Sequence, residues 1–326
     1  MTTAPPGTRP HGGNLDEARA AYGGDRAAWL DLSTGINPRP YPLPDFPAHC
    51  WRDLPDTGLQ DRLVDAARRF WSVPGNVDIV AANGASALIA ALPRVFETGS
   101  VHIPAPTYNE HAAAFSAAGW RVSESRDAPD EANARVLVNP NNPDGTVHGD
   151  DAFRDVDLGI ADESFADTLA PGSLPQPAAR KATIRLKSFG KFWGLAGTRL
   201  GFAVCPPAVA NSLRSFLGPW NVSGPALVAG ACALDDTAWA ARTRKRLASD
   251  AKRLDVLVGR AGAEVEGGTS LFRLYRVDSA ERWHRHLATH RIWSRVFPFH
   301  AGWIRLGLPG TEDAWGRLEK ALEAVA

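Results

Sequence analysis

Short apolar runs alternate with helical patterns through the middle of the chain, and this alternation constrains the fold more than any other feature. The runs are four to six residues long and are bounded by Gly, Pro and Asn: Asp78–Ala82, Ser100–Ile103, Arg135–Val138, Leu158–Ala161, Thr183–Leu186 and Leu200–Cys205. Helical patterns begin between them at Ala85, at Asn109 and near Asp151. The alternation predicts an α/β fold, with a mostly parallel sheet covered by helices.

The two ends of the chain have a different organisation. A helical pattern at Leu15–Tyr22 and a Pro- and Gly-rich segment, Trp29–Pro44, indicate an arm. The C-terminal part mixes helical and strand patterns: Thr237–Gly259, Ser270–Val277, Glu281–His290, Ile292–Phe297, Trp303–Leu308 and Glu312–Val325. We therefore expect an N-terminal arm over residues 1–45 that joins the small domain and the active site. A large domain follows over 46–235, and a small α+β domain over 236–326.

Charge and cysteine usage narrow the function classes. Lys+Arg and Asp+Glu number 36 each, and a nucleic-acid or anionic-membrane partner favours a basic excess, so we expect a small-molecule partner instead. The start from Met1 to His11 has no apolar run, and no later stretch approaches the ~20 apolar residues of a membrane span. Cys50, Cys205 and Cys232 stand far apart without a Cys-x-x-Cys pair. This predicts no metal site, no disulfide framework and a cytoplasmic location.

The glycine-rich stretch Leu186–Phe202 contains the most informative lysine. Only six of the 36 Lys and Arg residues are lysines, so lysine chemistry has few candidates. The stretch places Ser188, Lys191 and Arg199 in a turn between two apolar runs. Pyridoxal phosphate suits such a loop, because its aldehyde condenses with a lysine and its phosphate needs charge-assisted donors. An exposed basic loop explains the same residues, so the remaining motifs must decide.

A second motif, Gly84-Ala85-Ser86, follows an apolar run and opens a helical pattern. Its backbone N–H groups and the Ser86 hydroxyl are suited to hold a phosphate. Such a glycine turn is common and weak on its own. The chain has neither the Gly-x-Gly-x-x-Gly pattern of dinucleotide sites nor a Walker loop around it.

Three further polar or aromatic residues follow strand-like runs. Tyr108 could present a flat surface to a cofactor ring or simply be packed, and Asn142 stands in a sequence typical of turns. Asp162 ends the run Leu158–Ala161, where a carboxylate needs a cationic partner. A protonated pyridine nitrogen is such a partner.

Taken together, the glycine turn, the aromatic residue, Asn-Pro-x-Gly, Asp, Ser-x-x-Lys and Arg occur in an order that resembles the fold-type I pyridoxal-phosphate enzymes of the class I/II aminotransferase superfamily. The resemblance extends from about Trp29 to the C-terminus. It implies that Lys191 forms the Schiff base, that Asp162 pairs with the pyridine nitrogen, and that Tyr108 stacks on the ring. Asn142 would bond the ring hydroxyl, and Arg305 would bind a substrate carboxylate. The implied phosphate-binding residues are Gly84, Ala85, Ser86, Ser188 and Arg199.

Two positions depart from the superfamily pattern. Phe165 stands where many members have a tyrosine, which removes one hydrogen bond to the ring oxygen, a net loss of about 1 kcal/mol. Leu54 stands where relatives often carry a tyrosine that reaches into the partner subunit. The tyrosine contact between subunits is therefore not expected from this position.

The arm bears on the choice of reaction, because the orientation of the substrate decides which bond at Cα breaks. His11-Gly12-Gly13 and Asn37 offer backbone and side-chain donors to an anion, although a flexible arm with a turn explains the same residues. The arm sequence is similar to that of the threonine-phosphate decarboxylases of cobalamin synthesis, relatives of the histidinol-phosphate aminotransferases. That resemblance implies loss of CO₂ from L-threonine O-3-phosphate, with Arg295 and Arg305 steering the substrate anions.

Two alternatives remain open at the level of sequence. One is an aminotransferase of the histidinol-phosphate type, and the other is a catalytically silent ligand-binding domain of the same fold. Lys191 and Asp162 argue against the silent domain, as does the absence of a DNA-binding module before it. A homodimer is expected, because the superfamily builds its sites between subunits and the arm needs a surface to lie on.

Overall fold

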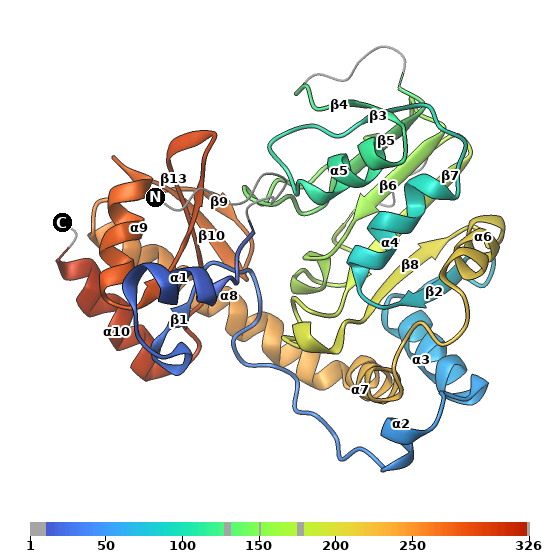
Figure 1. Cartoon of the computed structure of the whole chain (residues 1–326), viewed down its shortest axis with the longest axis horizontal. Coiled ribbons are helices and arrows are strands. Elements are labelled where there is room, and N and C mark those ends of the chain that lie inside the picture. Colours follow the sequence, from blue (N-terminus) through green and yellow to red (C-terminus); the bar gives the residue numbers. More distant parts are fainter. Residues whose placement is uncertain (1–10, 127–131, 150, 175–178, 325–326) are drawn as a thin grey trace.

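A seven-stranded sheet forms the centre of the larger of two lobes in the computed structural model (Figure 1). The structure describes residues 11–126, 132–149, 151–174 and 179–324, so the predicted first ten residues of the arm and the predicted helix end at Val325 lie outside it. The strand order is β2-β8-β7-β6-β5-β3-β4. The strands are β2 (Asp78–Ala82), β3 (Ser100–His102), β4 (Arg121–Ser123), β5 (Ala134–Val138), β6 (Leu158–Asp162), β7 (Ala182–Ser188) and β8 (Gly201–Cys205).

The sheet is mostly parallel, as predicted. β3 to β7 pair in parallel with their neighbours, and β8 runs antiparallel to β2 and β7. Every residue of β5, β6 and β8 is buried, which explains why these segments are continuous apolar runs rather than alternating ones. The short edge strand β4 was not predicted, because its three residues are exposed or half-buried and carry no apolar run.

Helices cover both faces of this sheet. One core cluster lies between the sheet and α4 (Ala85–Ala91), α5 (Glu110–Ala117) and α6 (Pro207–Leu217). A second lies between the sheet and α3 (Thr57–Phe70) and α7 (Gly224–Asp235), and it continues into the smaller lobe. Short helical segments complete the lobe: α2 (His49–Arg52), η2 (Leu92–Arg94), η3 (Ala166–Thr168) and η4 (Ala196–Thr198).

The helix predicted near Asp151 is wrong. Residues 151–155 form turns, and their polar groups bind a side chain of the sheet instead of continuing a helix. Arg135 of β5 donates to the Ala152 carbonyl at 2.6 Å and to both carboxylate oxygens of Asp155 at 2.9 and 2.8 Å. The Ala152 carbonyl and the Asp155 carboxylate of this turn thus satisfy the buried guanidinium.

The smaller lobe is built on a four-stranded antiparallel sheet of order β12-β13-β10-β9. Its strands are β9 (Glu264–Gly268), β10 (Phe272–Arg276), β12 (Arg295–Phe297) and β13 (His300–Gly307). Its helices are α8 (Thr237–Arg260), α9 (Ala280–Thr289) and α10 (Glu312–Glu323). In Figure 1, α8 runs from the larger lobe beneath this sheet. The expected α+β character of the C-terminal part is confirmed.

The N-terminal arm lies on the smaller lobe before it crosses to the larger one (Figure 1). It contains α1 (Leu15–Tyr22), η1 (Arg26–Ala28) and β1 (Leu30–Asp31), and β1 pairs in parallel with β11 (Ile292–Trp293). Leu15 and Trp29 pack with Trp293 in a small apolar cluster of their own. The domain boundaries at 45/46 and 235/236 stay predictions.

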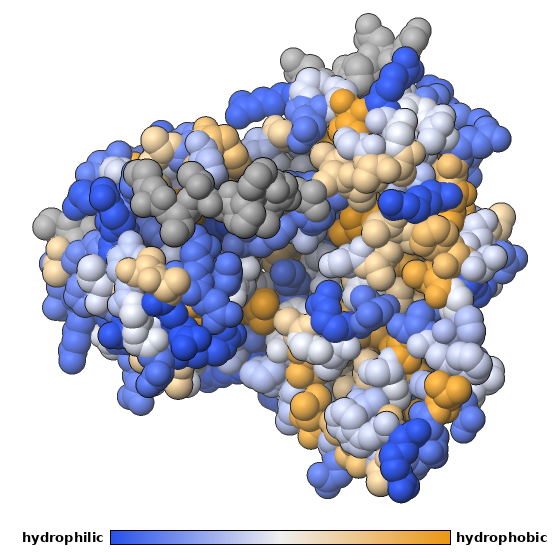
Figure 2. Space-filling view, in the orientation of Figure 1, coloured by the Kyte–Doolittle hydropathy of each residue, from blue (hydrophilic) through white to orange (hydrophobic). Residues whose placement is uncertain are grey.

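The surface is hollowed between the two lobes, and the face in Figure 2 is more hydrophilic on the smaller lobe than on the larger one. Within the described ranges, no helix combines the length and the apolar character that a membrane-spanning segment needs.

Candidate active site

Two adjoining cavities lie where the ends of the central strands meet the arm and the smaller lobe. The inner cavity, of about 360 Å³, lies at the ends of β6 and β7 and beside the start of α4. The outer cavity, of about 640 Å³, opens between the arm, the loop after β3 and the β12–β13 hairpin. Tyr108, Asn142, Phe165 and Lys191 line both cavities and form the border between them. A ligand held in the inner cavity would therefore face a second ligand in the outer one.

All the residues predicted to bind the cofactor line the inner cavity: Gly84, Ala85, Ser86, Tyr108, Asn142, Asp162, Ser188, Lys191 and Arg199. They come from five separate stretches of sequence, at residues 84–86, 108, 142, 162 and 188–199. β2, β6 and β7 run in the same direction, because β8 is antiparallel to both β2 and β7, so their C-terminal ends meet at one edge of the sheet. The structure thus brings the set together, and the role of each residue stays a prediction.

One wall of the inner cavity is formed by Gly84 and Arg199. Gly84 has a φ of +83°, and a Cβ there would lie 2.8 Å from a guanidinium nitrogen of Arg199. Arg199 is itself left-handed, with a φ of +50°, and donates to the Ala196 carbonyl at 3.0 Å. Only glycine allows the arginine to approach the backbone ahead of Ser86 so closely. A guanidinium beside free backbone donors is a suitable site for a phosphate.

The carboxylate of Asp162 lies at the base of the inner cavity and is 2% exposed. Its Oδ2 is 2.8 Å from His111 Nε2, and its Oδ1 accepts from the Ser164 hydroxyl at 2.5 Å and the Ser164 N–H at 3.0 Å. Burial alone raises the pKa of Asp162, but His111 and the two Ser164 hydrogen bonds outweigh it, and the pKa is lowered. The group is therefore held as an anion that can face a cation.

Lys191 lies at the border of the two cavities. No described residue forms a hydrogen bond or ion pair with its amine, which lies 5.5 Å from the centre of the Phe165 ring. Burial, followed by the charges of Arg305 and Arg199 and opposed by Asp162, lowers the pKa of Lys191 to about 8. An amine with this pKa is partly neutral near pH 7 to 8 and can act as a nucleophile.

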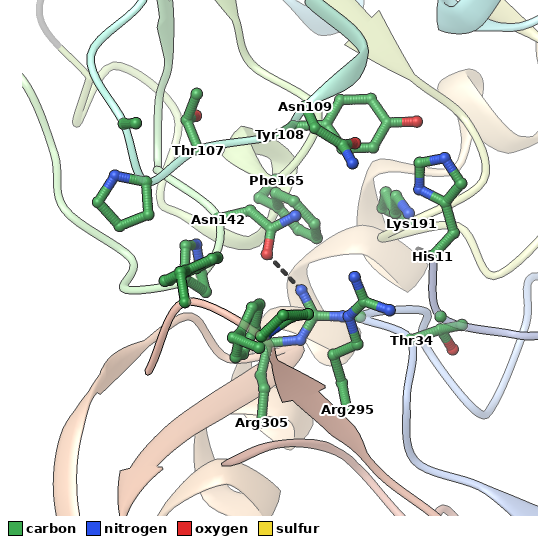
Figure 3. Close-up of a pocket in the computed structure, with 18 of the residues that line it drawn as sticks. His11, Thr34, Thr107, Tyr108, Asn109, Asn142, Phe165, Lys191, Arg295 and Arg305 are labelled. Carbon is green, nitrogen blue, oxygen red and sulfur yellow. Dashed lines mark hydrogen bonds between the residues drawn. The ribbon is translucent and has the colours of Figure 1, made fainter. Parts of the chain in front are cut away.

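Two arginines of the smaller lobe point into the outer cavity (Figure 3). Arg305 of β13 is buried and donates to the Ser33 carbonyl at 2.7 Å and to the Asn142 side-chain oxygen. Its Nε has no hydrogen-bond partner among the described residues. Burial, and for Arg305 also the neighbouring Arg295, lowers the pKa of both guanidinium groups. Two desolvated cations that close together are suited to an anionic ligand.

The arm closes one side of the outer cavity. His11 Nε2 lies 2.9 Å from a Glu110 carboxylate oxygen, and the His11 ring is 6.0 Å from that of Tyr108. Gly12 lines both cavities, and Gly13 lines the inner one, where its N–H donates to the Ser33 hydroxyl at 2.7 Å. His11 and Gly12 therefore line the outer cavity, and their role in substrate binding stays a prediction.

Asn37 is a correction to the predicted substrate site. It is 2% exposed and lines neither cavity. Its Nδ2 donates to the Phe192 carbonyl at 2.8 Å, and its Oδ1 accepts from Arg246 at 2.9 Å. The amide oxygen and one of the two Nδ2 hydrogens are already engaged, and the group lies outside both cavities, so it is not placed to bind a substrate anion.

The two departures from the family pattern have clear positions. Phe165 lines both cavities, and its ring packs edge-on against the Phe272 ring with the ring centres 5.0 Å apart. Gly35 lies against both rings, because a Cβ at this position would be within 3.0 Å of an atom of each ring. Leu54 is 64% exposed and lies on a separate groove, away from both cavities. The site thus has an apolar wall at Phe165 and no contribution from Leu54 of the same chain.

The residues of the inner cavity fit pyridoxal phosphate. An amine without an ion-pair partner suits its aldehyde, the buried Asp162 anion suits its ring nitrogen, and the Gly84–Arg199 wall suits its phosphate. Both ends of the cavity thus have the charge that the group requires.

Sequence reasoning missed the residues that support Asp162. His111 is 1% exposed and sits on α5, directly after the predicted helix start, where a single histidine carries no recognisable pattern. Ser164 follows Asp162 by two residues, a spacing typical of a local side-chain turn. Only this second residue had a local signal in the sequence.

Residues 49–325 match the family model described as aminotransferase class I and II. The chain is 39% identical over 330 residues to a threonine-phosphate decarboxylase of Pseudomonas aeruginosa, with 96% of each protein covered. It is 37% identical to a threonine-phosphate decarboxylase of a Sinorhizobium species, covering 96% of this chain and 97% of that protein. Its fold is similar to a histidinol-phosphate aminotransferase of Sinorhizobium meliloti solved with pyridoxal-5'-phosphate, with a TM-score of 0.78, 17% identity, and 100% of this chain and 99% of that one covered.

Proposed function

The chain belongs to the class I and II aminotransferase family, and we propose that within it the protein is a pyridoxal-phosphate-dependent decarboxylase of L-threonine O-3-phosphate. The product would be (R)-1-amino-2-propanol O-2-phosphate, a precursor in cobalamin biosynthesis. The observation that carries the proposal is the pair of cavities, with Lys191 between an inner site for the cofactor and an outer site with two desolvated arginines. The similarity to two threonine-phosphate decarboxylases over nearly the whole chain supports it.

Inner-cavity residues would hold the cofactor at three points. Arg199, Ser188 and the backbone at Gly84–Ser86 bind its phosphate, Asp162 keeps its ring nitrogen protonated, and Tyr108 covers its ring. When bound, pyridoxal phosphate supplies an aldehyde that combines with amines and a ring that accepts electrons from Cα. Lys191 Nζ would hold the aldehyde of the cofactor and, as the amine at the border of the two cavities, would deliver a proton to Cα of the substrate.

Outer-cavity residues would bind and orient the substrate. Threonine phosphate carries two anionic groups, and Arg295, Arg305 and the His11–Gly13 arm offer cations and N–H donors around one space. We propose that the arm binds the substrate phosphate and turns the carboxylate out of the ring plane. In that orientation the bond to the carboxylate, rather than the Cα–H bond, would be the one placed for cleavage.

One assay separates decarboxylation from amino transfer. Purified, cofactor-loaded protein is incubated with threonine phosphate, with and without a keto acid, and both CO₂ and amino acid products are measured. We expect CO₂ release that does not depend on the keto acid. Keto-acid-dependent amino transfer without CO₂ would assign the chain to the aminotransferases of this family, and neither reaction would indicate a ligand-binding protein.

We also propose that the protein is a homodimer. Leu43, Trp51, Leu54 and Trp220 are each more than half exposed and line one apolar groove on the larger lobe. The same groove is lined by Gly194, Leu195, Gly197 and Thr198, in the loop between Lys191 and Arg199. A second copy on this groove would cover exposed aromatic surface and support the active-site loop.

Light scattering after gel filtration tests the dimer. The unaltered protein should elute as a dimer, and Trp51→Glu should shift it toward monomer with loss of activity. Val256→Glu is the matched control, because Val256 is 57% exposed on α8 and does not line the groove. A fully active monomer would overturn the proposal.

The expected cytoplasmic location also stays a proposal. It is supported by the three cysteines, which are all free thiols, two of them buried.

A further inference from the structure

The arm is bonded to the backbone of the Lys191 loop through Asn37 and Tyr41, which line neither cavity. Asn37 N donates to the Lys191 carbonyl at 3.0 Å, and Asn37 Nδ2 donates to the Phe192 carbonyl at 2.8 Å. Tyr41 N donates to the Trp193 carbonyl at 2.9 Å. Two residues of the arm, Asn37 and Tyr41, thus bind three consecutive carbonyls of this loop.

The orientation of the Asn37 amide is fixed by a helix of the smaller lobe. Its Oδ1 accepts from Arg246 Nη2 of α8 at 2.9 Å and from the Arg39 N–H at 3.1 Å. With two donors on the oxygen, the nitrogen must face the Phe192 carbonyl. Arg246 is itself paired with Asp250 at 3.3 Å, one turn along α8.

Aromatic packing holds the other side of the loop. The Trp193 ring is stacked between Phe189 and Trp239, with ring centres 5.2 and 5.3 Å away and planes tilted by 14° and 13°. Its indole N–H donates to Asp167 at 3.2 Å. At Gly194, with a φ of +70°, a Cβ would lie 2.7 Å from both the Asn37 carbonyl oxygen and Pro40 Cα. The loop therefore has little room to move away from the arm.

We propose that Asn37, held by Arg246, is a positioning residue for Lys191. The inference rests on the proposed role of Lys191 as the cofactor-binding lysine. Asn37 touches neither cavity, yet it binds the backbone of Lys191 and of the next residue, so it determines the point from which the Lys191 amine reaches the border of the cavities. Proton return to Cα depends steeply on that position, because small misplacements of a reacting group are costly.

The experiment compares Asn37→Leu, which keeps the branched shape of the side chain but removes the amide donor and acceptor, with Tyr41→Phe. Tyr41 lies on the same arm segment, and its hydroxyl donates to the Cys232 carbonyl at 3.2 Å, away from the Lys191 loop. Asn37→Leu loses the side-chain bond to the Phe192 carbonyl of the loop, and Tyr41→Phe loses a side-chain bond outside the loop. The backbone bond from Asn37 N to the Lys191 carbonyl remains in both variants. Arg246→Gln, which removes the donor to Asn37 Oδ1, serves as the second test and replaces Asn37→Leu if that variant fails to fold.

The first readout is the reactivity of Lys191 in the cofactor-free protein. Trace acetylation at graded pH, followed by mass spectrometry of the Lys191 peptide and of exposed Lys181 as reference, gives the pKa of the amine without any turnover. In the unaltered protein and in Tyr41→Phe the midpoint should lie at about 8. Asn37→Leu and Arg246→Gln should shift the midpoint of Lys191 acetylation, or change the rate of Lys191 acetylation relative to Lys181 at least about twofold. The reason is that the amine no longer holds its position beside Arg305 and Arg199.

The second readout is steady-state kinetics. Asn37→Leu should lower kcat about tenfold and leave KM within about twofold, because the lost bond acts on the proton-transfer step and not on substrate binding. A rise in KM with kcat unchanged would show direct substrate binding by Asn37 and overturn the proposal. Unchanged Lys191 labelling in a destabilised variant would also overturn it. Absence of CO₂ release from the unaltered enzyme would sink the proposed function alone, because the labelling result does not depend on the reaction.

Discussion

The inner and outer cavities share a border at Lys191 but are built in different ways. The inner cavity is formed by the ends of strands in one sheet: Gly84 follows β2, Asp162 ends β6 and Ser188 ends β7. The outer cavity is assembled from the arm, the loop after β3 and a hairpin of the smaller lobe. Strand ladders fix the first, and packing between distant segments fixes the second. The inner cavity thus depends on a single sheet, and the outer one on contacts between elements of both lobes.

Lys191→Ala should have the largest effect. It should remove the visible absorption of the bound cofactor and lower turnover by at least ~10³-fold. Lys187→Met is the control. Lys187 is a buried lysine on β7, 2.5 Å from Glu163 and outside both cavities, so its loss should lower stability rather than remove the absorption. The reverse pattern would move the Schiff base to Lys187 and break the assignment of the inner cavity.

Asp162→Asn should keep cofactor binding and slow the reaction by about 10²–10³-fold, since a preorganised charge at the ring nitrogen is lost. His111→Gln should have a smaller effect in the same direction, because it removes one of the groups that lower the pKa of Asp162. Titration with the cofactor, followed by absorbance, would measure cofactor affinity, and single-turnover kinetics would measure the rate of the reaction. A near-normal rate in Asp162→Asn would refute the role.

Arg305→Leu tests the outer cavity. It should lower kcat/KM for threonine phosphate by about 10–100-fold, the range for one charge-assisted hydrogen bond of about 1.5–3 kcal/mol, and leave the cofactor affinity within about threefold. Arg253→Leu is the control, because Arg253 pairs with Glu312 on the surface. Loss of cofactor binding in Arg305→Leu would show that cofactor binding and substrate binding are not divided between the two cavities.

His11→Ala should have a smaller effect, about tenfold on decarboxylation, and none on cofactor binding. The side chain is partly exposed and already shares its contact with Glu110, so its contribution is screened by water. Unphosphorylated threonine should be a poor substrate for the unaltered enzyme, and His11→Ala should lower the rate on threonine only slightly further. Equal rates on threonine and its phosphate would remove the phosphate-binding role of the arm.

The smallest effect concerns pH and the stability of the cofactor-free protein. The pKa of Lys191 falls from 10.5 to about 8 on folding, so between these values the unfolded chain binds more protons and stability rises with pH. Below about pH 8 the charged amine is unfavourable in the folded state. In Lys191→Met this pH-dependent gain should disappear, as measured by urea unfolding at pH 7 and pH 9.5. An unchanged pH profile would contradict the lowered pKa.

Sequence patterns predicted the inner cavity well, because each of its motifs is a short segment attached to one strand. Gly84-Ala85-Ser86, Asp162 and the Ser188–Lys191 spacing carry their geometry locally, and the sheet only has to align them. His111 could not be predicted in this way. It reaches Asp162 across 51 positions of sequence, and nothing near it indicates that contact.

What the sequence alone determined is the alternation of buried strands and helices in the larger lobe, the family resemblance and the residues at the strand ends, because local apolar periodicity and turn residues encode these features. What only the tertiary structure decided is the surroundings of Lys191. Asn37 reads as a substrate donor in the sequence, yet the crossing of the arm beneath the Lys191 loop turns its amide toward Phe192 and Arg246. The physical reason is that an amide binds whichever donors and acceptors packing brings to it, and that packing joins segments up to 209 positions apart.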